Sequence, residues 1–358
     1  MTYKIMHKDK VIALADDNGV TEIIDKSLCP NCFTIGMPLE YWLEGRMVDI
    51  HRSHSRKLFK ALRLRNPDST AQIIDIGHGI SITDNWWLQK KEEELDYKDL
   101  KKYNEELADI ALYGSSSSDS PRSSGYRELG TVGSYEKAWR YIDGCWYMYK
   151  QGNKQELISE YYSYAFLKAL NVHVAEYEIK HISIKETGIK NTFIITKDFT
   201  DNAAVDFEPF CNYYNDHDEP EYILQRLDDK LLVPYVMMIF YDALLHNDDR
   251  HNQNVGVFRD SKTGEIIGLA PYFDYNLSLI ATGIPRIDSK KGNLFTESFL
   301  SNDICKKILR ENLPDRKSII NASTAASKLT REKISKSIKT SEIKNYILST
   351  YDYLADRL

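Results

Sequence analysis

The sequence predicts an α+β fold, because hairpin patterns and long helical patterns occupy separate stretches of the chain. Aromatic-rich segments at 137–142 and 145–150 flank an Asp143-Gly144 pair, a dipeptide typical of tight hairpin turns. Residues 231–245 are almost wholly apolar, yet this run of fifteen residues is too short to cross a bilayer and indicates a buried core helix. At 42% hydrophobic residues, the chain can bury a substantial core.

Residues 1–112 are expected to form an N-terminal accessory domain. They begin with short strand-like segments, include an amphipathic helical pattern at 56–64 and end in a helical pattern at 97–110. A serine-rich stretch follows within residues 113–125, and its composition is typical of a flexible linker. The sequence therefore predicts a domain boundary at this stretch.

Residues 126–200 combine the first hairpin with a helix and a further strand. The helical pattern begins at Lys154, where apolar residues recur along one broad face. The apolar run 192–196 indicates a buried strand, and Lys197-Asp198-Phe199 follows it directly. We expect this exit from the strand to act as a hinge.

Residues 201–358 are expected to be largely helical, apart from one hairpin. Strand-like segments at 255–258 and 266–269 enclose a polar turn that contains Gly264. Three further helical patterns occur towards the C-terminus, at 301–309, 331–338 and 341–354. We expect these helices to pack against the base of the same region.

The motif that carries chemistry runs from Asp249 to Asn254, with Asp274 twenty positions after Asn254. Phosphoryl transfer needs one carboxylate to orient the attacking hydroxyl, and an amide oxygen with a second carboxylate to hold Mg²⁺. An Asp, four residues and an Asn is the spacing of a kinase catalytic loop. One such match is expected by chance on the order of once in a chain this long. The predicted hairpin between the two parts strengthens the kinase interpretation, because a hairpin folds Asp274 back beside Asn254. The alternative interpretation is a buried helix followed by a polar turn and a hairpin with charged loops.

Three upstream features suit a nucleotide site. Lys150 ends the second strand of the first hairpin, where its ammonium would reach phosphates, although a solvated strand end explains it as well. Gly133 and Ser134 lie in a loop whose backbone N–H groups would cover phosphates, with an ordinary loop as the alternative. Glu160, ten residues after Lys150, is placed to pair with that lysine or to be a solvated acid.

The order of these parts resembles the HipA-like serine/threonine kinases, a bacterial family that includes toxin–antitoxin kinases. The likeness covers under half of the chain, from about Gly130 to about Leu279. It rests on Gly133-Ser134-Tyr135-Glu136-Lys137, Lys150, Glu160-Tyr161-Tyr162, Asp249 to Asn254, and Pro271-Tyr272-Phe273-Asp274. The resemblance implies a two-lobed, protein-kinase-like fold that binds ATP and Mg²⁺, with residues 126–200 as the N-lobe and 201–358 as the helical C-lobe.

Roles follow from the resemblance residue by residue. Asp249 matches the catalytic carboxylate, Asn254 and Asp274 match the metal ligands, and Lys150 matches the phosphate-contacting lysine. The residues implied to bind ATP are Gly133, Ser134, Lys150, Thr196, Lys197, Phe199, His251 and Asn254. Lys150 and Asp249 would thus be the catalytic pair.

The loop departs from that of ordinary protein kinases. Its histidine, His251, follows the catalytic Asp instead of preceding it, an order shared with phosphoinositide lipid kinases. Members of the HipA-like family often carry autophosphorylated serines in the phosphate loop, where Gly130 and Val132 stand in this chain. The serines from Ser115 to Ser124 are other acceptors close in sequence, or simply part of a linker.

The sequence therefore predicts an ATP- and Mg²⁺-dependent kinase that modifies serine or threonine hydroxyls of a protein substrate. A toxin-type role and an antitoxin-like partner protein are implied by the resemblance alone. Two alternatives stay open: a kinase of a lipid or small-molecule hydroxyl, and a catalytically silent binding module that keeps the kinase shape.

Composition bears on the binding partners and the cellular compartment of the protein. A formal net charge of -6 argues against direct nucleic-acid binding as the main activity, although a local basic run begins at His51. Residues 1–10 lack the apolar core of a secretory signal, and an odd number of cysteines, five, suits a reducing compartment. We expect a cytoplasmic protein without a membrane partner. Cys29 and Cys32 are expected to be packed thiols, with a zinc site as the alternative.

Overall fold

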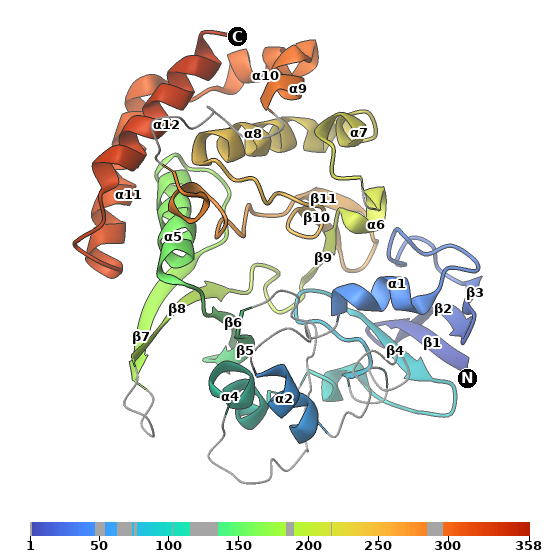
Figure 1. The fold of residues 1–358 in the computed structure, drawn as a ribbon. Helices are drawn as coiled ribbons and strands as arrows, with labels where there is room; N and C mark the ends of the chain where they lie inside the picture. Colours follow the sequence, from blue (N-terminus) through green and yellow to red (C-terminus); the bar gives the residue numbers. More distant parts are fainter. Residues whose placement is uncertain are drawn as a thin grey trace. The chain divides into compact units, whose positions relative to one another are not determined.

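The computed structural model describes residues 2–46, 54–62, 74, 77–101, 103–114, 135–183, 190–215, 217–284 and 296–358 (Figure 1). Two compact units share the chain. The first unit comprises Met1–Gln151, Ile195–Glu208 and Val257–Ile267, and the second comprises Gly152–Ile194, Pro209–Gly256 and Gly268–Leu358. The chain passes between the units several times, so neither unit is one continuous segment.

The first unit begins with an antiparallel sheet of four strands in the order β3-β2-β1-β4. Its strands are β1 (Thr2–His7), β2 (Lys10–Asp16), β3 (Gly19–Ile23) and β4 (Trp86–Lys90). Helix α1 (Leu39–Leu43), followed by the 3-10 turn η1 (Glu44–Arg46), lies on this sheet. Gly19 is needed at its turn, because its φ is +125° and a Cβ there would collide with the Met37 carbonyl group.

The predicted first hairpin is present with the expected bounds. Strands β5 (Lys137–Ile142) and β6 (Cys145–Lys150) pair antiparallel, with Ile142 opposite Cys145. Asp143 and Gly144 have φ values of 49° and 82°, the positive values that a two-residue hairpin turn requires. Helix α4 (Glu105–Tyr113) packs on β5, and helix α2 (Ser55–Ala61) packs on α4.

One helix of the first unit is shorter than predicted. The helical pattern at 97–110 corresponds to a 3-10 turn, η2 (Tyr97–Asp99), and to α4, which begins only at Glu105. Asn104 lies between them in an extended conformation, and its side chain accepts a hydrogen bond from the Leu107 N–H. This N-cap starts a new helix, which is why the pattern is not one continuous helix.

Two further sheets use strands from later in the chain. One has the order β5-β6-β8-β7, with β7 (Tyr177–Ser183) and β8 (Lys190–Lys197). The other has the order β11-β10-β9, with β9 (Val205–Pro209), β10 (Gly256–Asp260) and β11 (Ile266–Leu269). The strands predicted at 192–196, 255–258 and 266–269 are therefore present.

The second unit is largely helical. Its long helices are α5 (Lys154–Ala169), α8 (Asp229–Leu245), α11 (Arg316–Lys333) and α12 (Thr340–Ala355). Its shorter elements are α6 (Cys211–Tyr214), α7 (Pro220–Leu224), η3 (Leu279–Thr282), α9 (Thr296–Ser301) and α10 (Asp303–Asn312). In Figure 1, α11 packs along α5 and α12 packs along α11. The predicted core helix is α8, whose side chains are all buried from Tyr235 to its end at Leu245.

Two helix predictions near the C-terminus were wrong in their bounds. Of the pattern at 331–338, only residues 331–333 are helical, and they are the end of α11, which begins at Arg316 behind an Asp315 N-cap. The pattern at 301–309 corresponds to α9 and α10, which are separated by the N-cap Asn302. Residues 316–330 are rich in Asn, Ser and Thr, which have weak helix propensity, so packing against α5 decides their conformation.

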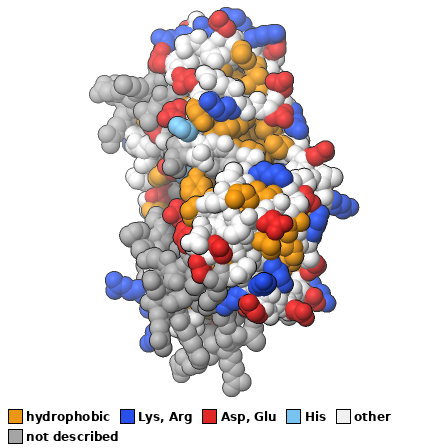
Figure 2. Space-filling view, turned by 90° about the vertical axis from the view of Figure 1, so that its right-hand side faces the viewer, with side chains coloured by type: hydrophobic (Ala, Val, Ile, Leu, Met, Phe, Trp, Pro, Cys, Tyr) orange, Lys and Arg blue, Asp and Glu red, His pale blue; other side chains and the backbone are white. Residues whose placement is uncertain are grey.

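The surface carries both signs of charge. On the face shown in Figure 2, the described Lys and Arg side chains are interspersed with Asp and Glu side chains. Within the described residues, no helix is both long and apolar enough to cross a membrane.

Cys29 is a buried thiol that donates to the Ile12 carbonyl, and burial raises its pKa to about 11. His51, where the basic run begins, lies outside the described residues.

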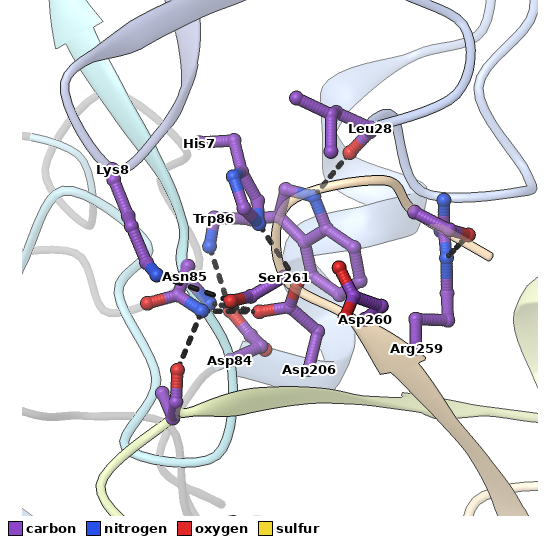
Figure 3. Close-up of polar contacts among 12 residues, drawn as sticks. His7, Lys8, Leu28, Asp84, Asn85, Trp86, Asp206, Arg259, Asp260 and Ser261 are labelled. Carbon is purple, nitrogen blue, oxygen red and sulfur yellow. Dashed lines mark hydrogen bonds and ion pairs between the residues drawn. The ribbon is translucent and has the colours of Figure 1, made fainter. Parts of the chain in front are cut away.

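A buried polar network ties the N-terminal sheet to β9 and β10 inside the first unit (Figure 3). His7 Nε2 lies 2.7 Å from Asp206 Oδ2, and Asp206 Oδ1 accepts from the backbone N–H and the side-chain amide of Asn85. Arg259 donates to Glu208 at 2.6 Å and to the backbone carbonyls of the segment before α1. Each buried charge thereby has a partner, as burial in a low-dielectric interior requires.

Replacing Glu208 by alanine should destabilise the first unit by about 3–5 kcal/mol, because Arg259 would keep its charge without a carboxylate. All five tryptophans lie in this unit, so urea unfolding followed by tryptophan fluorescence reports on it specifically. Lys98→Ala is the control, since its ion pair with Asp96 is exposed and should contribute little. Equal unfolding midpoints for the two variants would contradict this account.

Candidate active site

The site begins where helix α8 ends. His246 stops the helix in a left-handed conformation, with φ at 46°, and the Asn247 N–H turns back to the Asp242 carbonyl at 2.9 Å. The Asn247 side chain also donates to Asp242 Oδ1 at 3.0 Å. The loop that follows, 247–254, is therefore fixed to a helix that is itself buried in the core.

Asp242 and Arg250 form a buried two-point ion pair. Arg250 Nε donates to Asp242 Oδ2 at 2.9 Å, and its Nη2 donates to Oδ1 at 3.0 Å. The ring of Tyr275 lies over the guanidinium, 4.8 Å from ring centre to Cζ. Burial by itself lowers the pKa of Arg250, but the adjacent Asp242 carboxylate raises it above its usual value. Arg250 is thus a fixed cation.

The remaining nitrogen of Arg250 joins the loop to the segment before Asp274. Nη1 donates to the Asn254 carbonyl at 2.8 Å and to the Phe273 carbonyl at 2.9 Å, and it lies 3.3 Å from Asn254 Oδ1. The guanidinium therefore brings together Asn254 and the residue next to Asp274, which are separated by a hairpin in the sequence. We refer to this arrangement of Asp242, Arg250, Asn254 and Phe273 as the Arg250 clamp.

Asn254 closes the loop on itself. Its Nδ2 donates to the Asp249 carbonyl at 2.7 Å, and its Oδ1 accepts the His251 N–H at 3.1 Å. The Asp249 N–H lies 3.4 Å from Asn247 Oδ1. The main chain of Asp249 is thus held on both sides, while its side chain is half-buried and keeps a surface for a ligand.

The loop alternates between buried and more exposed side chains. Arg250, Asn252 and Asn254 are buried, whereas Asp249, His251 and Gln253 are half-buried or exposed. Asn252 anchors the loop to the segment around α6: its N–H donates to Asp218 at 2.7 Å, and its amide donates to the His217 carbonyl at 2.8 Å. The loop is therefore anchored near both of its ends and at its middle.

Asp274 has an unusual backbone. Its φ is 60°, a left-handed value that costs energy for a residue other than glycine. The preceding carbonyl, of Phe273, accepts from Arg250, and the Asp274 N–H donates to the Tyr177 hydroxyl at 3.2 Å. Such backbone strain persists where surrounding contacts over-determine the conformation, which is common in functional sites.

The oxygens near the clamp suit a Mg²⁺ ion. Asn254 Oδ1 and the Asp274 carboxylate are hard donors, and Mg²⁺ is commonly held by one or two carboxylates together with phosphates and water. The 3.3 Å contact from Arg250 to Asn254 Oδ1 is longer than an ordinary hydrogen bond, so a cation would displace it at little cost. Asp242 neutralises the guanidinium beside this position. Within the described residues, no group of three or more His, Cys, Asp or Glu is arranged to hold a metal.

The residues predicted to contact ATP from the N-lobe lie in the first unit where they are described. Lys150 ends β6 opposite Lys137, and Thr196 and Lys197 end β8. Phe199 follows β8 and packs edge-on against Phe207, with ring centres 5.5 Å apart. Gly133 and Ser134 lie outside the described residues. The meeting of Lys150 with Glu160, or of these residues with Asp249, stays a prediction.

Two residues of this site were not singled out as site residues from the sequence. Asp242 interrupts an otherwise apolar helix, and Arg250 stands directly after the predicted catalytic Asp. An acid in a buried helix must find a cation or a set of donors, because an unpaired buried charge is costly. That signal predicts a partner for Asp242 but does not say which residue supplies it.

No sequence-family model matches the chain, and neither does any curated protein. Among solved structures, a chain of the HipA, HipB and operator DNA toxin–antitoxin complex of Shewanella oneidensis MR-1 aligns with a TM-score of 0.52 at 12% identity, covering 99% of this chain and 96% of that chain. The chain has the HipA kinase fold. The predicted fold class is thereby confirmed. The Helicobacter pylori proinflammatory kinase CtkA aligns over 62% of this chain and 90% of that chain, with a TM-score of 0.40 at 18% identity.

Arg250→Met should destabilise the second unit by about 3–5 kcal/mol, because it leaves the buried Asp242 carboxylate unpaired. Urea unfolding followed by circular dichroism measures the loss. The matched control is Arg316→Met, which removes an exposed partner of Asp352. Adding Asp242→Leu to Arg250→Met should recover part of the stability, since the unpaired charge is then gone. A single variant as stable as the control would show that the clamp does not hold the loop.

The imidazole of His246 should titrate above its usual range. Burial lowers its pKa, but the hydrogen bond and charge of Asp248, whose Oδ2 is 3.0 Å from Nδ1, raise it overall. A raised pKa in the folded state means that the contact stabilises the protein at low pH and is lost as pH rises through that pKa. Histidine NMR titration, assigned with His246→Asn, measures the value. In Asp248→Asn it should fall; an unchanged value would assign the shift to another cause.

Proposed function

We propose that this protein is an ATP- and Mg²⁺-dependent kinase that phosphorylates serine or threonine hydroxyls of a protein. The observation that carries the proposal is the Arg250 clamp, which joins the 249–254 loop to Asp274. The HipA kinase fold supports it, as does the order of the motifs along the sequence, which resembles that of the HipA-like kinases. The likeness itself extends only to the fold.

In the proposed reaction, Asp249 accepts a hydrogen bond from the acceptor hydroxyl and orients its oxygen. A bond forms between this oxygen and the γ-phosphorus, while the bond from that phosphorus to the β-phosphate oxygen breaks and ADP leaves. The hydroxyl proton passes to Asp249 late in the transfer. The fixed main chain of Asp249 serves this role, because catalysis by positioning requires the carboxylate to stay in place.

The other groups stabilise charge. Asn254 and Asp274 would hold Mg²⁺, and Lys150 would contact the phosphates. Bound Mg²⁺–ATP supplies the phosphoryl group and the positive charge that offsets its developing negative charge. Thr196 and Lys197 at the end of β8, and Phe199 just after it, would border the adenine. Gly133 and Ser134 would lie over the phosphates, and His251 of the 249–254 loop would also contact ATP. Most of the acceleration would come from this electrostatic arrangement.

The proposal also includes a partner protein, which rests on the likeness of fold alone. The Shewanella oneidensis complex contains HipB and operator DNA besides HipA. By that likeness of fold, we include an antitoxin-like protein as a candidate partner of this chain. Cytoplasmic location, in which ATP and Mg²⁺ are both present, fits the same proposal.

The decisive variant is Asp249→Asn, which should lower phosphate transfer by roughly 10²–10⁴-fold and leave Mg²⁺–ATP binding nearly unchanged. Labelled ATP, incubated with cell lysate protein and separately with phosphoinositide vesicles, measures transfer; thermal shift with Mg²⁺–ATP measures binding. Asp248→Asn is the matched control, because this neighbouring acid is exposed and pairs with His246.

The outcomes separate the alternatives. Label on serine or threonine of lysate proteins supports the proposal, whereas label confined to the vesicles indicates a lipid kinase. No thermal shift with Mg²⁺–ATP would indicate a silent binding module. Transfer by Asp249→Asn at the rate of the parent protein would falsify the role given to this carboxylate.

A further inference from the structure

The peptide group between Phe273 and Asp274 is held at both of its polar ends. Its carbonyl accepts from Arg250 Nη1 at 2.9 Å, and its N–H donates to the Tyr177 hydroxyl at 3.2 Å. A peptide group is planar, so two such contacts fix its orientation. They therefore set the direction in which Asp274 leaves the strand-like segment 270–273.

Tyr177 links this peptide group to helix α5. It is the first residue of β7 and is buried, and its hydroxyl is hydrogen-bonded to the Glu160 side chain of α5. Glu160 is also buried, with 2% of its surface exposed. A phenol has one proton, so it donates to the carboxylate and accepts from the Asp274 N–H.

The segment around Asp274 needs this restraint. Asp274 sits at a φ of 60°, from which an Asp released from its contacts would relax towards ordinary backbone values. Upstream, Tyr272 pairs with residues 173–175 through two backbone hydrogen bonds of 2.9 Å. These bonds end at Tyr272, and the peptide group that leads into Asp274 is held beyond them by Arg250 and Tyr177.

We propose that Tyr177 is a positioning residue that couples Glu160 on α5 to Asp274, so that the metal-binding carboxylate is correctly oriented only while Glu160 is in place. The proposal rests on the function given above, in which Asp274 holds Mg²⁺. A displacement of α5 would release the Tyr177 hydroxyl and, with it, the Asp274 N–H. The arrangement makes the position of one helix a condition for metal binding.

Tyr177→Phe tests the coupling, because it removes the hydroxyl and keeps the ring. The Mg²⁺ concentration that gives half-maximal phosphate transfer should rise by roughly 10–100-fold, the usual effect of removing a group that orients a metal ligand. The matched control is Tyr164→Phe. Tyr164 contacts the Tyr177 ring at 5.6 Å between centres, but its hydroxyl donates to Glu176. The Mg²⁺ requirement of this control should stay at the value of the parent protein.

A second measurement is independent of phosphate transfer. Hydrogen–deuterium exchange of peptides that cover 270–276 should be faster in Tyr177→Phe and in Glu160→Gln than in Tyr164→Phe. Tyr177→Phe removes the acceptor of the Asp274 N–H, and Glu160→Gln weakens the hydrogen bond that holds this acceptor in place. Glu160→Gln serves if Tyr177→Phe does not fold, since Gln accepts the phenol proton more weakly than a carboxylate does.

The two experiments separate two failures. A parent protein that transfers no phosphate overturns the proposed function, while exchange still tests the link from Glu160 to Asp274. Unchanged exchange and an unchanged Mg²⁺ requirement in Tyr177→Phe overturn the coupling. A lowered melting temperature with an unchanged Mg²⁺ requirement also overturns it, because the hydroxyl would then be only structural.

Discussion

The ion pair between Asp242 and Arg250 is the interaction on which the candidate site depends. Neither charge can be buried alone without a large loss of stability. Removing one partner of a buried ion pair typically destabilises a protein by about 3–5 kcal/mol. Once Asp242 holds two nitrogens of the guanidinium, the third nitrogen has a fixed direction, and that direction is towards Asn254 and Phe273. One acid in a core helix thereby places a loop and the residue before Asp274. Arginine is suited to this task because its donors form a rigid planar fork, which lysine lacks.

The same ion pair helps to hold Asp274 in a strained backbone conformation. Asp274 has a left-handed backbone, and its peptide group is restrained by Arg250 on one side and Tyr177 on the other. Functional sites need their groups within roughly half an ångström of the working geometry, and buried supports achieve this better than exposed ones. Helix α8 is such a support, since its side chains from Tyr235 to Leu245 are all buried.

The local parts of the fold follow from the sequence, and the long-range parts do not. The hairpin at Asp143-Gly144 and the apolar helix α8 have signals confined to a few neighbouring residues, and both are present with nearly the predicted bounds. Helix α11 was largely missed because its Asn, Ser and Thr residues favour no helix by themselves, and its packing on α5 is invisible in the local pattern. Tyr177 was missed for a similar reason: nothing near it in sequence marks a strand-end tyrosine as a neighbour of Asp274, 97 residues away.

The alternation of burial along the loop gives a physical reason for the motif itself. Between Asp249 and Asn254, the spacing of a kinase loop leaves four residues free in principle, but two of them, Arg250 and Asn252, point inward here. Each inward residue carries several donors, and each anchors the loop to a different support: Arg250 to α8 and Phe273, Asn252 to Asp218 and His217. Because successive side chains alternate in this way, Asp249 and His251 share the more exposed side. Packing therefore explains the arginine in the order Asp-Arg-His: Arg250, which follows the proposed catalytic Asp249, fixes the loop to α8.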